Sequence, residues 1–82
     1  MKLPRDVSGE TLARSLKQFG YQVIRQNGSH VRLTSSERGF EHHVTIPSHK
    51  QLKVGTLSAI LSEIAEYLEM SRDELAAKLF GR

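Results

Sequence analysis

Cysteine is absent from this chain of 82 residues. Its absence excludes disulfide bonds, thiolate-bound metal sites and a cysteine nucleophile. The N-terminal segment MKLPRDVSGE lacks the apolar stretch of a signal peptide, and no other apolar run is long enough to span a bilayer. We therefore expect a soluble cytoplasmic protein that makes no membrane contact.

The chain is too short to enclose a large pocket. Proteins of this size bury only about 60% of the surface that the unfolded chain exposes, so the core is small. We predict a single domain over residues 1–82, with its core at about residues 8–68. Its chemistry would then take place on an open surface, which suits a polymer substrate better than a small metabolite.

The net charge of +3 is distributed unevenly. Residues 1–55 contain nine Lys and Arg against four Asp and Glu, whereas residues 56–82 contain three against five. A basic first part can present one face to a polyanion such as RNA. Ordinary surface scatter also produces such an asymmetry, so charge alone does not decide the function.

Helical patterns lie at both ends of the chain. Ser8 is placed as an N-cap, an apolar stripe through Leu12 and Leu16 follows, and Gly20 is suited to end the helix, which predicts a helix over residues 9–19. A second helix is expected to begin at Gly55-Thr56. Its apolar stripe comprises Leu57, Ile60, Leu61, Ile64 and Leu68.

A short third helix is predicted at about residues 72–80. Ser71 and Glu74 have the spacing of a capping box, and Met70 and Leu75 that of a hydrophobic staple. This helix lies beyond the predicted core, and we expect it to extend the core rather than to contact a partner.

Between the helices, three segments alternate as strands do: residues 21–26, 30–34 and 42–46. Asn27-Gly28 favours a tight hairpin turn, and Pro47 ends the third strand. The sequence therefore predicts an α+β fold. In it a three-stranded antiparallel sheet has helices on one face only.

Alternation along the strands predicts which side chains face solvent. Val31 and Leu33 share the core face of the second strand, so His30 and Arg32 point to the helix-free face. In the third strand, the same reasoning exposes His43 and Thr45. This uncovered face carries cations, imidazoles and a hydroxyl, so we expect that it can bind a phosphate backbone.

A metal site is not expected, although the chain has four histidines. His42 and His43 are adjacent in a strand, so they point to opposite faces and cannot bind one ion together. No acidic residue has a ligand spacing that would complete a set. We interpret His42 as a residue on the buried or edge side that is merely tolerated there.

Two segments, GYQVIRQNGSHVRLT and VTIPSHKQLKVGTLSAIL, resemble the HicA-like toxins of bacterial toxin–antitoxin modules. The resemblance covers about residues 8–66. Its matching elements are the aromatic residue after Gly20, Arg25-Gln26, Gly28-Ser29-His30, Pro47-x-His49 and Leu52-Lys53-x-Gly55-Thr56-Leu57 with Ile60-Leu61.

The resemblance implies a double-stranded-RNA-binding-like fold of order α-β-β-β-α. It also implies an mRNA interferase, an endoribonuclease that cuts RNA without a metal ion or other cofactor, with His30 at the position of the family's catalytic histidine. The partners implied are mRNA and a HicB-like antitoxin that covers the active site. We expect a monomer when free and a hetero-oligomer with the antitoxin.

The sequence departs from the family in two places. Many members carry a second histidine where this chain has Val31, a change that should be harmless because Val31 is expected to face the core. Many members also end near the second helix, whereas this chain continues beyond Tyr67.

Metal-free RNA cleavage requires a general base, a general acid and positive groups around the phosphate. His30 suits either proton-transfer role because the unperturbed pKa of histidine is about 6.5. The sequence leaves its proton-transfer partner open between His43 and His49. If the 2′-hydroxyl of RNA is the nucleophile, the products are a cyclic phosphate and a 5′-hydroxyl.

Five further residues are candidates for RNA binding. They are Gly28, Ser29, Arg32, Lys50 and Lys53. Each also has a purely structural interpretation: turn formation for the first two, and solvated surface charge for the other three.

The alternative function is an RNA-binding module of the same fold that does not cleave, and a third is a protein-docking domain. The acidic stripe Glu63, Glu66 and Glu69 would repel RNA, so it is either a solvated face, which we favour, or part of a protein interface.

Overall fold

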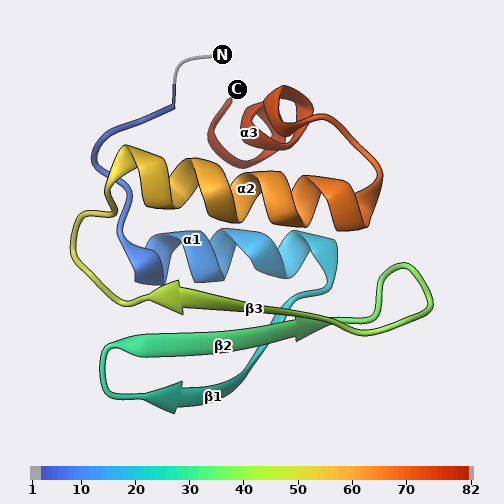
Figure 1. The fold of residues 1–82 in the computed structure, drawn as a ribbon, viewed down its shortest axis with the longest axis horizontal. Coiled ribbons are helices and arrows are strands. Elements are labelled where there is room, and N and C mark those ends of the chain that lie inside the picture. Colours follow the sequence, from blue (N-terminus) through green and yellow to red (C-terminus); the bar gives the residue numbers. More distant parts are fainter. Residues whose placement is uncertain (1–2, 82) are drawn as a thin grey trace.

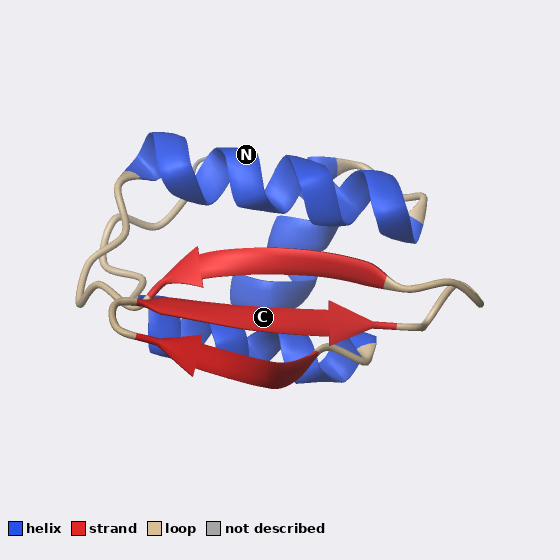
Figure 2. Ribbon diagram, turned by 60° about the horizontal axis from the view of Figure 1, so that its bottom comes forward, coloured by secondary structure: helices blue, strands red, loops and turns tan. Residues whose placement is uncertain are grey.

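The described part of the chain, residues 3–81, forms a sheet with helices packed on one of its faces (Figure 1). In this computed structural model the elements are α1 (Gly9–Ser15), the 3-10 helix η1 (Leu16–Phe19), β1 (Gln22–Asn27), β2 (His30–Ser35), β3 (His42–Pro47), α2 (Val54–Leu68) and α3 (Arg72–Phe80). The predicted α+β class, element order and three-stranded antiparallel sheet are confirmed. Figure 2 shows the strands in front of the helices, with their other face uncovered.

The first helix differs from its prediction in its second half. Its N-terminus is as expected, because the Ser8 hydroxyl accepts a hydrogen bond from the Thr11 amide at 3.0 Å. The α-helical part ends at Ser15, and residues 16–19 form a 3-10 helix instead. Gly20 then takes the left-handed conformation, with φ of 82°, and its amide donates to the Lys17 carbonyl. Tighter turns of this kind are common where a helix ends, because they satisfy its last carbonyl groups.

Strand β2 is the centre of the sheet and pairs antiparallel with β1 on one side and with β3 on the other. Arg32 lies opposite Arg25 of β1 and opposite Thr45 of β3. The β1–β2 register shifts between Val23 and Arg25, which is a β-bulge at this outer strand. Pro47 is the last residue of the other outer strand, where a missing amide does not interrupt a ladder.

The core lies between the sheet and the helices. Val31, Leu33, Val44 and Ile46 are buried on the helix side, as strand alternation predicts. The predicted stripe of α2 is buried as well, at Leu57, Ile60, Leu61, Ile64 and Leu68. Leu75 and Ala76 of α3 are fully buried in the same cluster, so the extra C-terminal helix does extend the core.

Gly9, the first residue of α1, allows this helix to begin directly against the end of β3. A Cβ atom at Gly9 would overlap the Pro47 carbonyl oxygen. The Gly9 amide also donates to the His49 carbonyl at 2.9 Å. The start of α1 therefore holds the loop that connects β3 to α2.

This close approach predicts that Gly9→Ala lowers the free energy of unfolding by about 1–3 kcal/mol, because the new methyl group overlaps the backbone of β3. Gly55→Ala is the matched control, since Gly55 is also in the first turn of a helix but has no atom within 4 Å of an added Cβ. It should leave stability unchanged or raise it by up to about 1 kcal/mol. Urea unfolding followed by circular dichroism measures both changes, and equal effects of the two substitutions would contradict the interpretation.

Candidate functional site on the open sheet face

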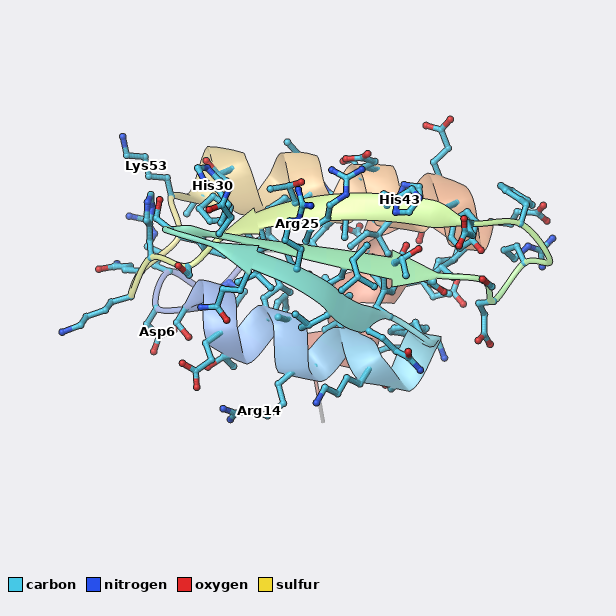
Figure 3. The ribbon with its side chains drawn as sticks, turned by 90° about the horizontal axis from the view of Figure 1, so that it is seen from below. Asp6, Arg14, Arg25, His30, His43 and Lys53 are labelled. Atoms are coloured by element: carbon cyan, nitrogen blue, oxygen red, sulfur yellow. The ribbon has the colours of Figure 1, made fainter. Side chains whose placement is uncertain are left out.

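The uncovered face of the sheet carries the residues that strand alternation predicts. His30, Arg32, His43 and Thr45 are all exposed there, which confirms their predicted orientation. Figure 3 looks onto this face and shows His30 near one end of the sheet and His43 in the other half. No described helix covers these side chains, so an extended polymer could lie across them.

His30 begins β2 directly after the hairpin turn. Gly28 in that turn has φ of 60°, a conformation that favours glycine, and nothing lies within 4 Å of its missing Cβ. The Ser29 carbonyl accepts a hydrogen bond of 2.7 Å from the Ser48 amide, which ties the turn to the end of β3. Within residues 3–81, the His30 imidazole makes no hydrogen bond or ion pair. The backbone of His30 is thus fixed while its ring is free to meet a substrate.

A shallow hollow in the open face brings His30 together with two arginines. Its lining is Arg25, Asn27, His30, Arg32 and Thr45. Arg25 and Arg32 are directly opposite in the β1–β2 register, and both are exposed. Neither forms an ion pair with an acidic side chain of residues 3–81. The hollow therefore holds uncompensated positive charge beside an imidazole.

Arg25 lines this hollow, but it is not among the site residues predicted from the sequence, where the turn is expected at Asn27-Gly28. In the structure the two turn residues are Gly28 and Ser29, and Asn27 is the last residue of β1, opposite His30. Counting outward from that pair places Arg25 opposite Arg32. A turn centred one residue earlier would place Arg25 opposite His30 instead, so a one-residue shift hides the arginine pair.

The two candidate lysines lie on the segment that leads into α2. Lys50 and Lys53 are both exposed, and Lys53 is the N-cap residue of α2 without a side-chain capping bond. Figure 3 shows Lys53 at the same end of the molecule as His30. The first backbone amides of α2 follow these lysines in the chain. Amides at a helix N-terminus have no partner within the helix and therefore bind anions well.

The register separates the two candidate proton-transfer partners of His30. His43 pairs with Thr34, four residues along β2 from His30, which corresponds to about 13 Å. Its Nε2 lies 4.0 Å from a carboxylate oxygen of Glu41. His49, in contrast, follows Ser48, the residue that is bonded to the turn before His30. Only His49 lies at the same end of the sheet as His30.

His42 lies on the helix side, opposite in direction to its neighbour His43, as predicted. Its Nδ1 is 2.7 Å from the Tyr21 hydroxyl, and its ring stacks on Tyr67 with the centroids 4.7 Å apart. The Nε2 atom on the other side of the ring lies 3.6 Å from the Glu63 carboxylate. The interpretation of His42 as merely tolerated is therefore wrong, because its ring links β3, α2 and the segment before β1.

The three residues of the acidic stripe, Glu63, Glu66 and Glu69, are all exposed. Glu63 approaches His42, and Glu69 forms an ion pair of 2.7 Å with Arg38 in the loop between β2 and β3.

Within the described residues 3–81, no three His, Asp or Glu side chains come together as metal ligands would. None of the helices in this range is both long and apolar enough to cross a membrane.

One protein family has a sequence model that matches residues 9–65, and it is described as the HicA toxin of bacterial toxin–antitoxin. The chain belongs to the HicA toxin family. It is therefore a toxin of a toxin–antitoxin system, and membership implies an antitoxin as its partner. No curated protein and no solved structure matches the chain. The matched range contains the whole open face of this HicA-family toxin and ends before α3.

The burial of the Tyr21 hydroxyl leads to a prediction about pH. Burial, followed by the nearby Tyr67 and Glu63, raises the pKa of the Tyr21 hydroxyl above its ordinary value near 10. Because the unfolded chain loses this proton first, the folded state should lose stability as pH rises above 10, by up to about 1.4 kcal/mol per pH unit from this group.

Tyr21→Phe removes that ionisation, so its free energy of unfolding should fall less steeply than that of the unsubstituted protein between pH 9 and 11. Urea unfolding at several pH values measures both slopes. Parallel pH profiles would show that Tyr21 does not have a raised pKa in the folded protein.

Proposed function

We propose that this HicA-family toxin is a metal-independent endoribonuclease that cleaves mRNA, with His30 as its catalytic residue. The observation that carries the proposal is the hollow in which the unengaged His30 imidazole lies next to Arg25 and Arg32 on an uncovered face. An open basic surface suits a long polyanion. Membership of the HicA toxin family supports a nuclease over other uses of this surface.

The reaction requires two proton transfers at one phosphodiester. A base removes the proton of the 2′-hydroxyl, the 2′-oxygen forms a bond to phosphorus, and the bond from phosphorus to the 5′-oxygen breaks. An acid protonates the departing 5′-oxygen, which leaves a 2′,3′-cyclic phosphate and a 5′-hydroxyl. His30 performs one transfer, and His49 is the better candidate for the other because His43 lies about 13 Å along the sheet.

The remaining candidates hold the RNA around His30. Arg32 lies two residues from His30 on the same face. From there its guanidinium can donate two parallel hydrogen bonds to a phosphate. Gly28 and Ser29 form the turn, and the open space at Gly28 lets backbone approach a phosphate closely. Lys50 and Lys53 extend the positive surface toward the N-terminus of α2, where amides favour a further phosphate.

The cellular consequence of this activity would be loss of mRNA, and with it the inhibition of translation and growth. We infer that a HicB-like antitoxin neutralises the toxin by covering the hollow around His30. The free toxin would be a monomer and the neutralised form a hetero-oligomer.

The alternative of an RNA-binding module without cleavage rests on one observation. No second histidine lies within hydrogen-bonding distance of His30 among residues 3–81, so the structure holds no preformed pair of proton carriers. Catalytic contacts often tighten only when substrate is bound, so this geometry does not decide against cleavage.

A comparison of His30→Ala with His43→Ala tests the proposal. Cleavage of a labelled mRNA fragment in the presence of EDTA should fall about 100-fold or more with His30→Ala, because general acid–base catalysis contributes factors of that size. RNA affinity should change little, and His43→Ala should cleave normally. Mass spectrometry of the products should show cyclic phosphate and 5′-hydroxyl ends.

Two results would overturn the proposal. If the unsubstituted protein binds RNA but does not cut it, the non-catalytic alternative is correct. If the products carry 5′-phosphate and 3′-hydroxyl ends, the 2′-hydroxyl is not the nucleophile and the role assigned to His30 is wrong.

A further inference from the structure

We infer that Arg25 and Arg32 act together as a two-arginine clamp for the RNA phosphate next to His30. The inference rests on the proposed function, and it adds Arg25, from the outer strand β1, as a substrate-binding residue. It also states what the clamp recognises, which is the charge of the sugar–phosphate backbone rather than the identity of a base.

The geometry of the clamp follows from the sheet register. Arg25 and Arg32 are paired residues of neighbouring antiparallel strands, so their Cα atoms are about 5 Å apart and their side chains leave the same face. Figure 3 shows the Arg25 side chain on the open face, between the positions of His30 and His43. Both arginines line the hollow that contains His30. Two guanidinium groups thus start from adjacent points and can converge on one anion.

The electrostatics of this pair are unfavourable without a ligand. Like charges directly opposite each other in a sheet destabilise it, and neither arginine has an acidic partner among residues 3–81. Two other arginines have acidic partners: Arg14 pairs with Glu10 at 2.9 Å, and Arg38 with Glu69 at 2.7 Å. A bound phosphate would remove the repulsion between the two guanidinium groups and supply the missing partner of both.

Arg32 is close enough to His30 for the clamp to act on the phosphate at which His30 transfers a proton. Arg32 lies two residues from His30 on the same face, a step of about 7 Å along β2 that an extended arginine side chain can bridge. Two guanidinium groups at the reacting phosphate would stabilise the extra negative charge that develops as the 2′-oxygen attacks. The lining of the hollow includes no Phe, Tyr or Trp ring on which a base could stack, and its one imidazole is that of His30. Recognition at this point would therefore depend little on base identity.

The experiment compares Arg25→Ala, Arg25→Lys, Arg32→Ala and the double alanine variant. Arg14→Ala is the control, because Arg14 is also an exposed arginine but belongs to α1, on the helix side of the sheet. We expect kcat/KM for RNA cleavage to fall about 10- to 100-fold for each single alanine variant. The double variant should lose less than the product of the two single losses, because both arginines hold one phosphate. Arg25→Lys should not restore the activity, since lysine cannot bind a phosphate in the forked geometry.

Binding is measured separately, in a His30→Ala background that leaves the RNA intact. The slope of log Kd against log salt should decrease by about one for Arg25→Ala and not at all for Arg14→Ala. Urea unfolding checks that the fold is intact. Because Arg25 is exposed and faces a like charge, Arg25→Ala should leave stability unchanged or raise it slightly.

The possible failures are distinguishable. If His30→Ala abolishes cleavage but Arg25→Ala behaves as Arg14→Ala in both cleavage and salt dependence, the clamp is wrong and the nuclease stands. If the unsubstituted protein does not cleave RNA, the nuclease is wrong. The binding slopes then decide the clamp alone: a loss specific to Arg25 supports it, and equal slopes for Arg25→Ala and Arg14→Ala overturn it.

Discussion

Burial of one face of the central strand β2 is the constraint on which the rest of the structure depends. Val31 and Leu33 are drawn into the core by the hydrophobic effect, and the period of a strand then forces His30 and Arg32 to the opposite face. A slip of one residue would exchange these two sets of side chains, burying a cation and exposing the core. The hydrogen bond between Ser48 and Ser29 and the pairing of β2 on both sides hold this register. The proposed site is thus produced by the same forces that produce the fold.

The two ends of the sheet have different tasks. At the end away from His30, the Tyr67 hydroxyl contacts the Phe40 carbonyl at 2.6 Å and accepts a hydrogen bond from the Arg38 amide, which holds the loop between β2 and β3. The Tyr21–His42 hydrogen bond lies beside it. Tyr21, Phe40 and Tyr67 thus form a cluster of rings with His42 at this end of the sheet. The hollow around His30 is left polar and basic.

Much of this arrangement could be predicted from the sequence because it depends on short-range patterns. Alternation gave the outward direction of His30, Arg32, His43 and Thr45, and capping residues gave the helix starts at Ser8 and Ser71. The features that were missed depend on longer-range or finer geometry. The bond from Tyr21 to His42 joins residues 21 positions apart, which no local pattern indicates. The arginine pair depended on the centre of a turn to within one residue. The change from α-helix to 3-10 helix depended on how the last turns before Gly20 satisfy their carbonyl groups.

The bulge in β1 affects whether copies of the protein associate through the edge of the sheet. Strand β1 is an outer strand, and its Val23 and Ile24 are about half exposed, at 47% and 51%. A straight apolar edge of this kind invites a strand from another chain to pair with it, which leads to aggregation. The irregular register at Ile24 breaks the evenly spaced row of amides and carbonyls that such pairing requires. This single extra residue therefore helps to keep neighbouring copies apart, so that the edge of the sheet does not become the start of a fibre.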